Sequence, residues 1–214
     1  LFLVDVSDSM LFSSGEKLKC EYVAEMISAL SYVIQREGNA IGICLFNDKI
    51  VKVIKPKLGT KSHFDITREL IRPKNYGGGC NLKNAIKNSM TILKIPSLLI
   101  IISDFIDIGK DWEKYLEIAS LKYNVIGICV RDRLDRCLPE NVGYFVVEDP
   151  SSEKKILIDT KEAHNYYNKK ISEEEYLIDK IFKRAKSSCL ILQTDDEYST
   201  PLIRFLEKRS KIKK

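Results

Sequence analysis

The sequence opens with LFLVDVSDSM, residues 1–10, and this stretch decides how the rest of the chain is interpreted. Its four leading apolar residues predict a buried strand, and Asp5 follows them directly. Ser7 and Ser9 come next, at alternate positions. Because ligands bind where the strands of an open parallel sheet end, we expect these oxygen-bearing side chains to lie in a binding site.

The composition of the chain indicates a single globular domain. With 214 residues, of which 44% are hydrophobic, the chain is long enough to bury a large core. No internal repeat, low-complexity segment or linker divides it, so one domain is expected over residues 1–214. Because the sequence begins inside a predicted strand and without methionine, we expect it to be the C-terminal part of a longer protein.

Charge and cysteine usage limit the kinds of partner and compartment. The formal net charge is +5, but much of the excess lies in a basic tail at about 207–214, which we expect to be solvated. No specific nucleic acid is therefore expected as a partner. The six cysteines form no CxxC pair, which favours a reduced, cytoplasmic location. The longest apolar run, 95–102, falls short of the roughly 20 residues that span a bilayer, so we expect no membrane span, and a tether outside this sequence stays open.

Apolar strands alternate with amphipathic helices along the chain. Helices are expected at about 16–37, 63–71, 82–93, 111–122, 161–187 and 201–209. Strands are expected at 1–4, 40–46, 50–55, 97–103, 125–130, 144–149, 154–159 and 189–193. Most of these strands are apolar at every position, which is typical of parallel sheets covered on both faces. The predicted class is therefore α/β, with a doubly wound, mostly parallel, Rossmann-like sheet and helices on both faces.

Two carboxylates are predicted to end neighbouring strands of this sheet. Asp5 ends the first strand and Asp104 ends the strand at 97–103. If these strands flank the switch point, both carboxylates open into one crevice with Ser7 and Ser9. The glycine loop 77–79 would enter the crevice from the side. Such oxygen donors suit Mg²⁺, Mn²⁺ or Ca²⁺ rather than zinc.

The motifs at these positions resemble a known family. DVSDSM (5–10) is similar to the DxSxS signature of von Willebrand factor A domains, whose metal-ion-dependent adhesion site is completed by a later glycine-rich loop and a later aspartate. GGGCNL (77–82) and IISDF (101–105) occupy those two places. The segments VVEDPSSEKKILIDT and TDDEYSTPLIRFLEKR extend the resemblance to the domain-of-unknown-function 58 family, a group of von Willebrand A proteins often associated with MoxR-type AAA+ ATPases.

The resemblance implies a role for each of five residues. Ser7 and Ser9 would bind Mg²⁺ or Mn²⁺ directly, and Asp5 and Asp104 would act largely through water. Cys80 stands where the family usually has threonine, and a thiol is a weak ligand for Mg²⁺. The resemblance further implies a protein partner that offers a carboxylate to the metal, with a MoxR-type AAA+ ATPase as the expected partner in protein assembly or remodelling.

Three alternatives stay open. The polar residues after the first strand could form only an Asx-type turn and a helix cap. The domain could also be a metal-free interaction scaffold, since Cys80 weakens the predicted site. In a haloacid-dehalogenase-like Mg²⁺-dependent phosphohydrolase, Asp5 would be the nucleophile, with Asp104 and Asp107 near the metal. That mechanism needs a carboxylic acid where this chain has Ser7, so no enzymatic activity is expected.

Overall fold

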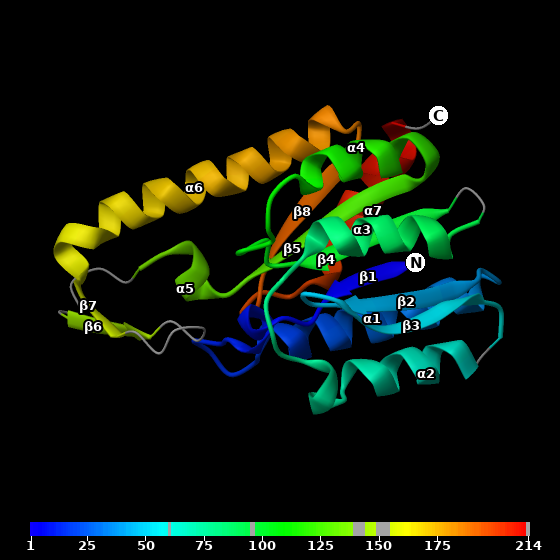
Figure 1. Ribbon diagram of the computed structural model, residues 1–214, viewed down its shortest axis with the longest axis horizontal. Coiled ribbons are helices and arrows are strands. Elements are labelled where there is room, and N and C mark those ends of the chain that lie inside the picture. Colours follow the sequence, from blue (N-terminus) through cyan, green and yellow to red (C-terminus); the bar gives the residue numbers. More distant parts are fainter. Residues whose placement is uncertain (60, 95–96, 139–143, 149–154, 213–214) are drawn as a thin grey trace.

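The computed structural model describes residues 1–214 except for 60, 95–96, 139–143, 149–154 and 213–214 (Figure 1). Its centre is a six-stranded sheet with the strand order β3-β2-β1-β4-β5-β8. The strands are β1 (Phe2–Asp5), β2 (Ile41–Phe46), β3 (Ile50–Lys57), β4 (Leu98–Ser103), β5 (Asn124–Arg131) and β8 (Ser188–Gln193). β3 pairs antiparallel with β2, and the other neighbours pair in parallel. The predicted α/β class with a mostly parallel, Rossmann-like sheet is confirmed.

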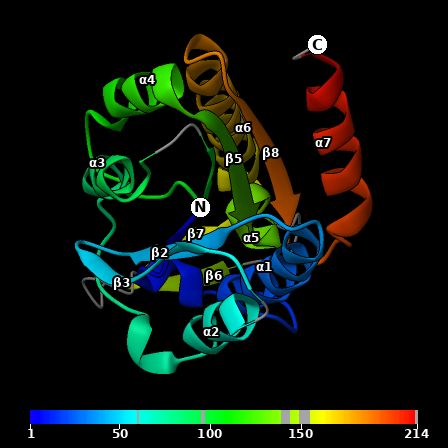
Figure 2. The ribbon, with the colours of Figure 1, turned by 90° about the vertical axis from the view of Figure 1, so that its right-hand side faces the viewer.

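Helices cover both faces of the sheet (Figure 2). The helices that pack on one face are α1 (Lys19–Arg36), α2 (Lys61–Leu70) and α7 (Ser199–Ile212). Those that pack on the other face are α3 (Leu82–Ile92), α4 (Trp112–Lys122) and α6 (Thr160–Arg184). This three-layer arrangement explains why the central strands are apolar at every position.

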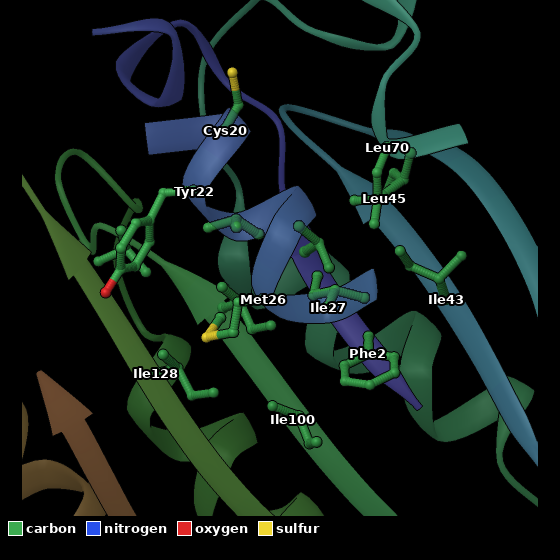
Figure 3. Close-up of a cluster of buried hydrophobic side chains, with 14 of the residues drawn as sticks. Phe2, Cys20, Tyr22, Met26, Ile27, Ile43, Leu45, Leu70, Ile100 and Ile128 are labelled. Carbon is green, nitrogen blue, oxygen red and sulfur yellow. The ribbon is translucent and has the colours of Figure 1, made fainter. Parts of the chain in front are cut away.

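Alternate strand residues supply the two cores. In β1, Phe2 and Val4 face the α1 side and Leu3 faces the α3 side, and all three are almost fully buried. Figure 3 shows Phe2 packed beneath Met26 and Ile27 of α1. Burying such side chains contributes about 1.5–3 kcal/mol each to folding, so the central strands are firmly held.

The switch point of the sheet lies at β1. This strand pairs with β2 on one side and with β4 on the other, and both pairs are parallel. The connections that follow β1 and β4 therefore leave toward opposite halves of the sheet, which opens a crevice at their carboxyl ends. Asp5, at the end of β1, and Asp104, directly after β4, both lie at these carboxyl ends, which form the carboxyl edge of the sheet.

The chain between β5 and α6 extends away from the main sheet. It contains α5 (Arg133–Arg136), β6 (Tyr144–Glu148) and β7 (Lys155–Asp159). β6 and β7 pair antiparallel in a separate two-stranded sheet, which Figure 1 shows at the far end of α6. Both strands were predicted, but their separation from the main sheet was not; positions 149 and 154 of the predicted strands lie outside the described residues.

Several element ends differ from the prediction. The first long helix starts at Lys19 rather than near residue 16, after the short 3-10 helix η1 (Asp8–Leu11). The last helix continues to Ile212, so the solvated basic tail predicted from 207 is helical as far as it is described. Basic side chains such as Arg209 and Lys211 suit the C-terminal turn of a helix, where the macrodipole favours positive charge. A further 3-10 turn, η2 (Pro73–Asn75), precedes the glycine loop.

No helix within the described part of the chain is both long enough and apolar enough to cross a bilayer.

Candidate functional site

Asp5 is fixed at the end of β1 by hydrogen bonds from two directions. Its side chain is 1% exposed. Oδ1 accepts a hydrogen bond from the backbone N–H of Ser7 at 2.9 Å, and Oδ2 accepts one from the hydroxyl of Ser103 at 2.6 Å. Burial raises the pKa of Asp5, and so does the nearby charge of Asp104, whereas the bonds from Ser103 and Ser7 oppose the rise. The ionised form of Asp5 is therefore destabilised by burial and by Asp104, and its hydrogen bonds only partly offset this effect.

The hydroxyls of Ser7 and Ser9 converge beside Asp5. Their Oγ atoms are 3.1 Å apart, Ser7 is buried, and Ser9 is partly exposed. η1 begins at Asp8, so Ser7 directly precedes this short helix and Ser9 lies within its first turn. Ser7 precedes η1 but its hydroxyl makes no cap hydrogen bond, although the Asx-type bond from Ser7 N–H to Asp5 is present. The capping alternative thus accounts for Asp5 and leaves the two hydroxyls unexplained.

The glycine loop is fastened to the end of β1 by its backbone. Gly77 N–H donates to the carbonyl of Val6 at 2.9 Å, and Asp8 N–H donates to the carbonyl of Gly78 at 2.9 Å. Gly77 and Gly78 have φ of 122° and 81°, which side chains other than glycine rarely adopt. These glycines let the loop fold back over β1, and they bring the next side chain, Cys80, into the site.

Cys80 contacts Asp5 as a hydrogen-bond donor. Its Sγ lies 3.2 Å from Asp5 Oδ2, and the residue is partly buried. Burial raises the pKa of the Cys80 thiol strongly, and the charge of Asp5 raises it further. The thiol is therefore neutral, and its proton points toward the carboxylate. Asn81, beside it, uses its side-chain oxygen to cap α3 by accepting from Asn84 N–H at 3.0 Å.

Asp104 lies directly after β4 in a constrained backbone. It is fully buried, and its Oδ1 accepts from Ile106 N–H at 3.0 Å. Phe105 has a φ of 56°, which is uncommon for a bulky residue, and its ring packs against Trp112 and Phe182 with centroids 5.8 Å away in each case. This packing holds the turn that directs Asp104 into the edge of the sheet.

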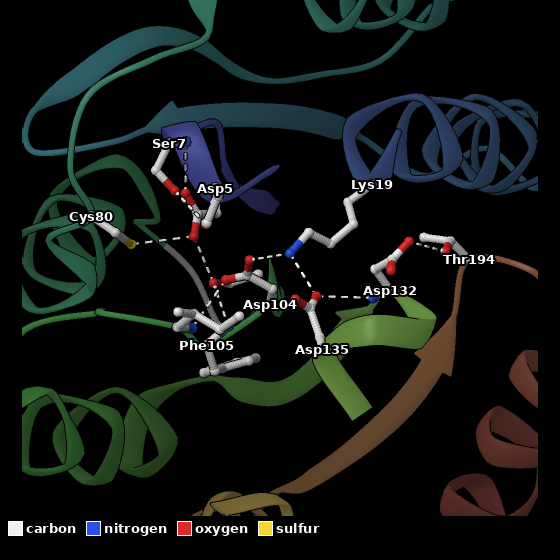
Figure 4. Close-up of polar contacts among 12 residues, drawn as sticks. Asp5, Ser7, Lys19, Cys80, Asp104, Phe105, Asp132, Asp135 and Thr194 are labelled. Atoms are coloured by element: carbon white, nitrogen blue, oxygen red, sulfur yellow. Dashed lines mark hydrogen bonds and ion pairs between the residues drawn. The ribbon is translucent and has the colours of Figure 1, made fainter. Parts of the chain in front are cut away.

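Lys19, which the sequence did not single out, completes the edge with a positive charge. It is the first residue of α1, and its side chain is 1% exposed. Its Nζ lies 2.7 Å from Asp104 Oδ2 and 2.7 Å from Asp135 Oδ2 (Figure 4). Burial alone would lower the pKa of Lys19, but the charges of Asp104 and Asp135 raise it above its usual value. The ammonium is therefore a resident cation of the site.

Asp132 and Asp135 extend the polar cluster from β5 into α5. Asp132 is fully buried, and its carboxylate accepts from the backbone N–H of Ser14 and of Leu134, each at 2.9 Å. Asp135 accepts from Asp132 N–H at 2.9 Å through the same oxygen that binds Lys19. The cluster thus joins the loop after η1, the start of α1 and the end of β5.

Two signals in the sequence could have indicated these missed residues. Lys19 lies in the first turn of the helix predicted at about 16–37, where the macrodipole disfavours a positive charge, so an acidic partner is expected for it. Asp132 follows the apolar strand at 125–130 with only Arg131 between them, and Asp104 directly follows the strand at 97–103. The rule that brought Asp5 and Asp104 together applies equally to Asp132.

The five predicted ligands share one edge but suit a divalent cation unequally. Asp5, Ser7 and Ser9 offer hard oxygen donors, which such a cation prefers. Cys80 offers a neutral thiol, and the oxygens of both carboxylates are engaged. Asp104 accepts from Lys19 and from Ile106 N–H, and Asp5 accepts from Ser7 N–H, from Ser103 and from Cys80. Among the residues that the structure describes, no three His, Cys, Asp or Glu side chains form a group able to hold a metal ion. The donor set therefore fits a cation bound directly by the hydroxyls of Ser7 and Ser9, with the charge of Asp5 beside them, and not by Cys80 or Asp104.

The fold and this polar edge place the chain among doubly wound α/β proteins with a candidate site at the switch point. The family model described as "Protein of unknown function DUF58" matches residues 1–176, and the chain belongs to this family. BatB from Bacteroides thetaiotaomicron, a conserved hypothetical protein, has a similar fold, with a TM-score of 0.64 and 17% identity over 100% of this chain and 98% of that one. An aerotolerance-related membrane protein from Bacteroides fragilis NCTC 9343 gives a TM-score of 0.56 and 16% identity over 89% of each chain. No curated protein sequence matches the chain.

Proposed function

We propose that this chain is a protein–protein interaction module of the von Willebrand A type, which contacts its partner at the carboxyl edge of β1 and β4. The observation that carries the proposal is the convergence of the Ser7 and Ser9 hydroxyls, 3.1 Å apart, on the buried Asp5. Apolar side chains adjoin this polar edge: Leu11 ends η1, the Phe12 ring centroid lies 5.6 Å from Lys19 Nζ, and the two residues are 41% and 39% exposed. A polar centre beside exposed apolar side chains suits a protein surface better than a small ion or metabolite alone.

In this proposal a divalent cation, Mg²⁺ or Mn²⁺, bridges the module and its partner. The hydroxyls of Ser7 and Ser9 would hold the cation directly, and Asp5 would act largely through water. A carboxylate from the partner would take a remaining coordination position. Asp104 would contribute charge rather than a direct bond, because Lys19 occupies its Oδ2. Cys80 would leave its coordination position to water.

The proposed partner is a MoxR-type AAA+ ATPase, with the pair acting in the assembly or remodelling of other proteins. Support for this partner comes from the family resemblance of the motifs and from membership in the DUF58 family. A cytoplasmic location belongs to the same proposal. It is supported by the six cysteines, all of which are free and most of which are buried or partly buried.

A second candidate is a module that binds its partner without a metal. The contact that favours it is the ion pair of Lys19 with Asp104, because an ammonium already neutralises one of the predicted metal-binding carboxylates. No catalytic role is proposed. Ser7 stands where a phosphohydrolase needs its general acid, and Asp5 is 1% exposed with both carboxylate oxygens engaged in hydrogen bonds, which does not suit a nucleophile.

Calorimetric titration of MgCl₂ and MnCl₂ into the chelator-treated chain tests the proposal. We expect weak, saturable binding that is lost in Ser9→Ala and tightened in Cys80→Thr, since threonine restores a hydroxyl donor. Ser13→Ala is the matched control, because Ser13 follows η1 and its hydroxyl bonds only within its own turn, to Gly15. Binding unchanged in Ser9→Ala, or absent from both the native chain and Cys80→Thr, would contradict the cation-bridged module.

A further inference from the structure

The position of Lys19 is unfavourable unless its charge is used. A lysine at the first position of a helix opposes the macrodipole, and a buried ammonium loses its hydration. Lys19 is 1% exposed and stands at this position of α1. Two contacts of 2.7 Å, to Asp104 and Asp135, compensate for both effects. The positive charge of Lys19 is therefore held behind the residues that end β1 and β4.

The ammonium engages the carboxylate on which a divalent cation would rely. Asp104 Oδ2 is bound by Lys19, and Oδ1 is bound by Ile106 N–H. Figure 4 shows the Asp104 carboxylate between Lys19 and Asp5. A cation at Ser7 and Ser9 would therefore meet a neutralised Asp104 and, behind it, the repulsive charge of Lys19.

A second buried cation lies at the same edge. Arg131, the last residue of β5, is 1% exposed, and its Nε and Nη2 have no hydrogen-bond partner among the described residues. Its charge interacts with those of Asp104 and Asp135. With Lys19 and Arg131 together, the edge carries its own positive charge beside Asp104, which reduces the attraction for an external cation.

We infer that Lys19 is the resident counter-ion of Asp104: it supplies from within the chain the charge that a divalent cation would otherwise bring, so the edge is assembled without metal and binds a cation only weakly. This inference rests on the proposed function, because it concerns the same edge. It assigns to Lys19 the role of a positioning residue that sets the cation affinity through Asp104.

The test compares thermal unfolding in EDTA and in MgCl₂ with Mg²⁺ calorimetry for the native chain and Lys19→Met. We expect the melting temperature of the native chain to be the same in both media. Lys19→Met, which keeps the length of the side chain and removes its charge, should melt lower in EDTA, recover with MgCl₂, and bind Mg²⁺ at least tenfold more tightly. Lys17→Met is the matched control, since Lys17 is 48% exposed and pairs with Glu25 at the surface.

A second variant covers the case in which Lys19→Met does not fold. Lys19→Met/Asp135→Asn also removes one of the two carboxylates that Lys19 neutralises, so that Asp104 alone lacks a counter-ion. We expect this double variant to fold and to show the same magnesium-dependent rise in melting temperature.

Failure of the inference is distinguishable from failure of the proposed function. If the native chain loses thermal stability in EDTA and binds Mg²⁺ as tightly as the Lys19 variants, the inference is overturned while the cation-bridged module stands. If only the Lys19 variants bind Mg²⁺, the inference is supported and the cation-bridged form of the function fails. If no variant binds Mg²⁺, both are overturned.

Discussion

Asp132 connects three segments of the chain through one buried carboxylate. It accepts hydrogen bonds from Ser14 after η1 and from Leu134 in α5, and Thr194 after β8 lies 3.5 Å away. Of the residues that supply these donors, Thr194 is buried, Leu134 is partly buried and Ser14 is exposed. The carboxylate thus keeps the loop after η1 against the ends of β5 and β8, which also supports the start of α1 that carries Lys19.

Asp132→Ala should destabilise the fold by about 2–4 kcal/mol, because it removes several hydrogen bonds to a buried carboxylate and the cap of α5. Urea unfolding followed by circular dichroism would measure the loss. Asp65→Ala is the control: Asp65 pairs with Arg68 and Lys57 on the surface of α2, and such pairs contribute about 1 kcal/mol or less. Similar losses in the two variants would show that the Asp132 contacts are not important for stability.

Residues of the site that directly follow a predicted strand could be predicted from the sequence. The positions of Asp5 and Asp104 came from the rule that polar residues ending parallel strands meet at one edge. The contacts of Lys19 were not predictable in this way, because its partners lie 85 and 116 positions away in the sequence. Likewise, the identity of Cys80 indicated a weak ligand, but only the fold shows that its proton is directed at Asp5.

At the scale of elements, the position of α6 depends on Gly127 of β5, which has no side chain. Gly127 lies in β5, and a Cβ at this position would be 2.5 Å from Cζ of Phe182 in α6 and 3.0 Å from Sγ of Cys189 in β8. The Phe182 ring in turn packs against Phe105 and Trp112. Close approach of α6 to β5 therefore supports the aromatic cluster that holds the turn after Asp104.

Gly127→Ala should lower the free energy of unfolding by about 1–3 kcal/mol, because α6 must shift to admit the methyl group. Chemical unfolding would measure the change, and Gly79→Ala is the control, since a Cβ there meets nothing within 4 Å. The shift should also disturb the packing of Trp112, which is the chain's single tryptophan and can be followed by fluorescence. An unchanged unfolding midpoint and tryptophan spectrum in Gly127→Ala would contradict this account of the packing.

The elements themselves were largely predictable, and their ends and associations were less so. Continuous apolar runs identified the parallel strands because burial on both faces demands such residues. The start of α1 was predicted too early, since the stretch before Lys19 contains polar residues that suit a helix start as well as a turn. The pairing of β6 with β7 outside the main sheet depends on where α6 carries the chain, which no local pattern encodes.

At the scale of the whole molecule, the two apolar cores stabilise the fold, and the carboxyl edge carries the polar groups proposed to bind a partner. The strands are anchored on both faces by apolar side chains, and the charged groups collect where β1, β4 and β5 end. The rigid sheet thereby fixes Asp5 and Asp104 relative to each other, while Ser9 and the glycine loop reach the surface. This arrangement suits a module that presents a preformed polar surface to another protein.

A crystal structure of the chain soaked in MnCl₂, with the anomalous signal of manganese recorded, would test the central claim most directly. The account predicts a single manganese beside the hydroxyls of Ser7 and Ser9, with Asp104 still paired to Lys19. Absence of manganese from this edge, or manganese bound directly to Asp104 with Lys19 displaced, would contradict it.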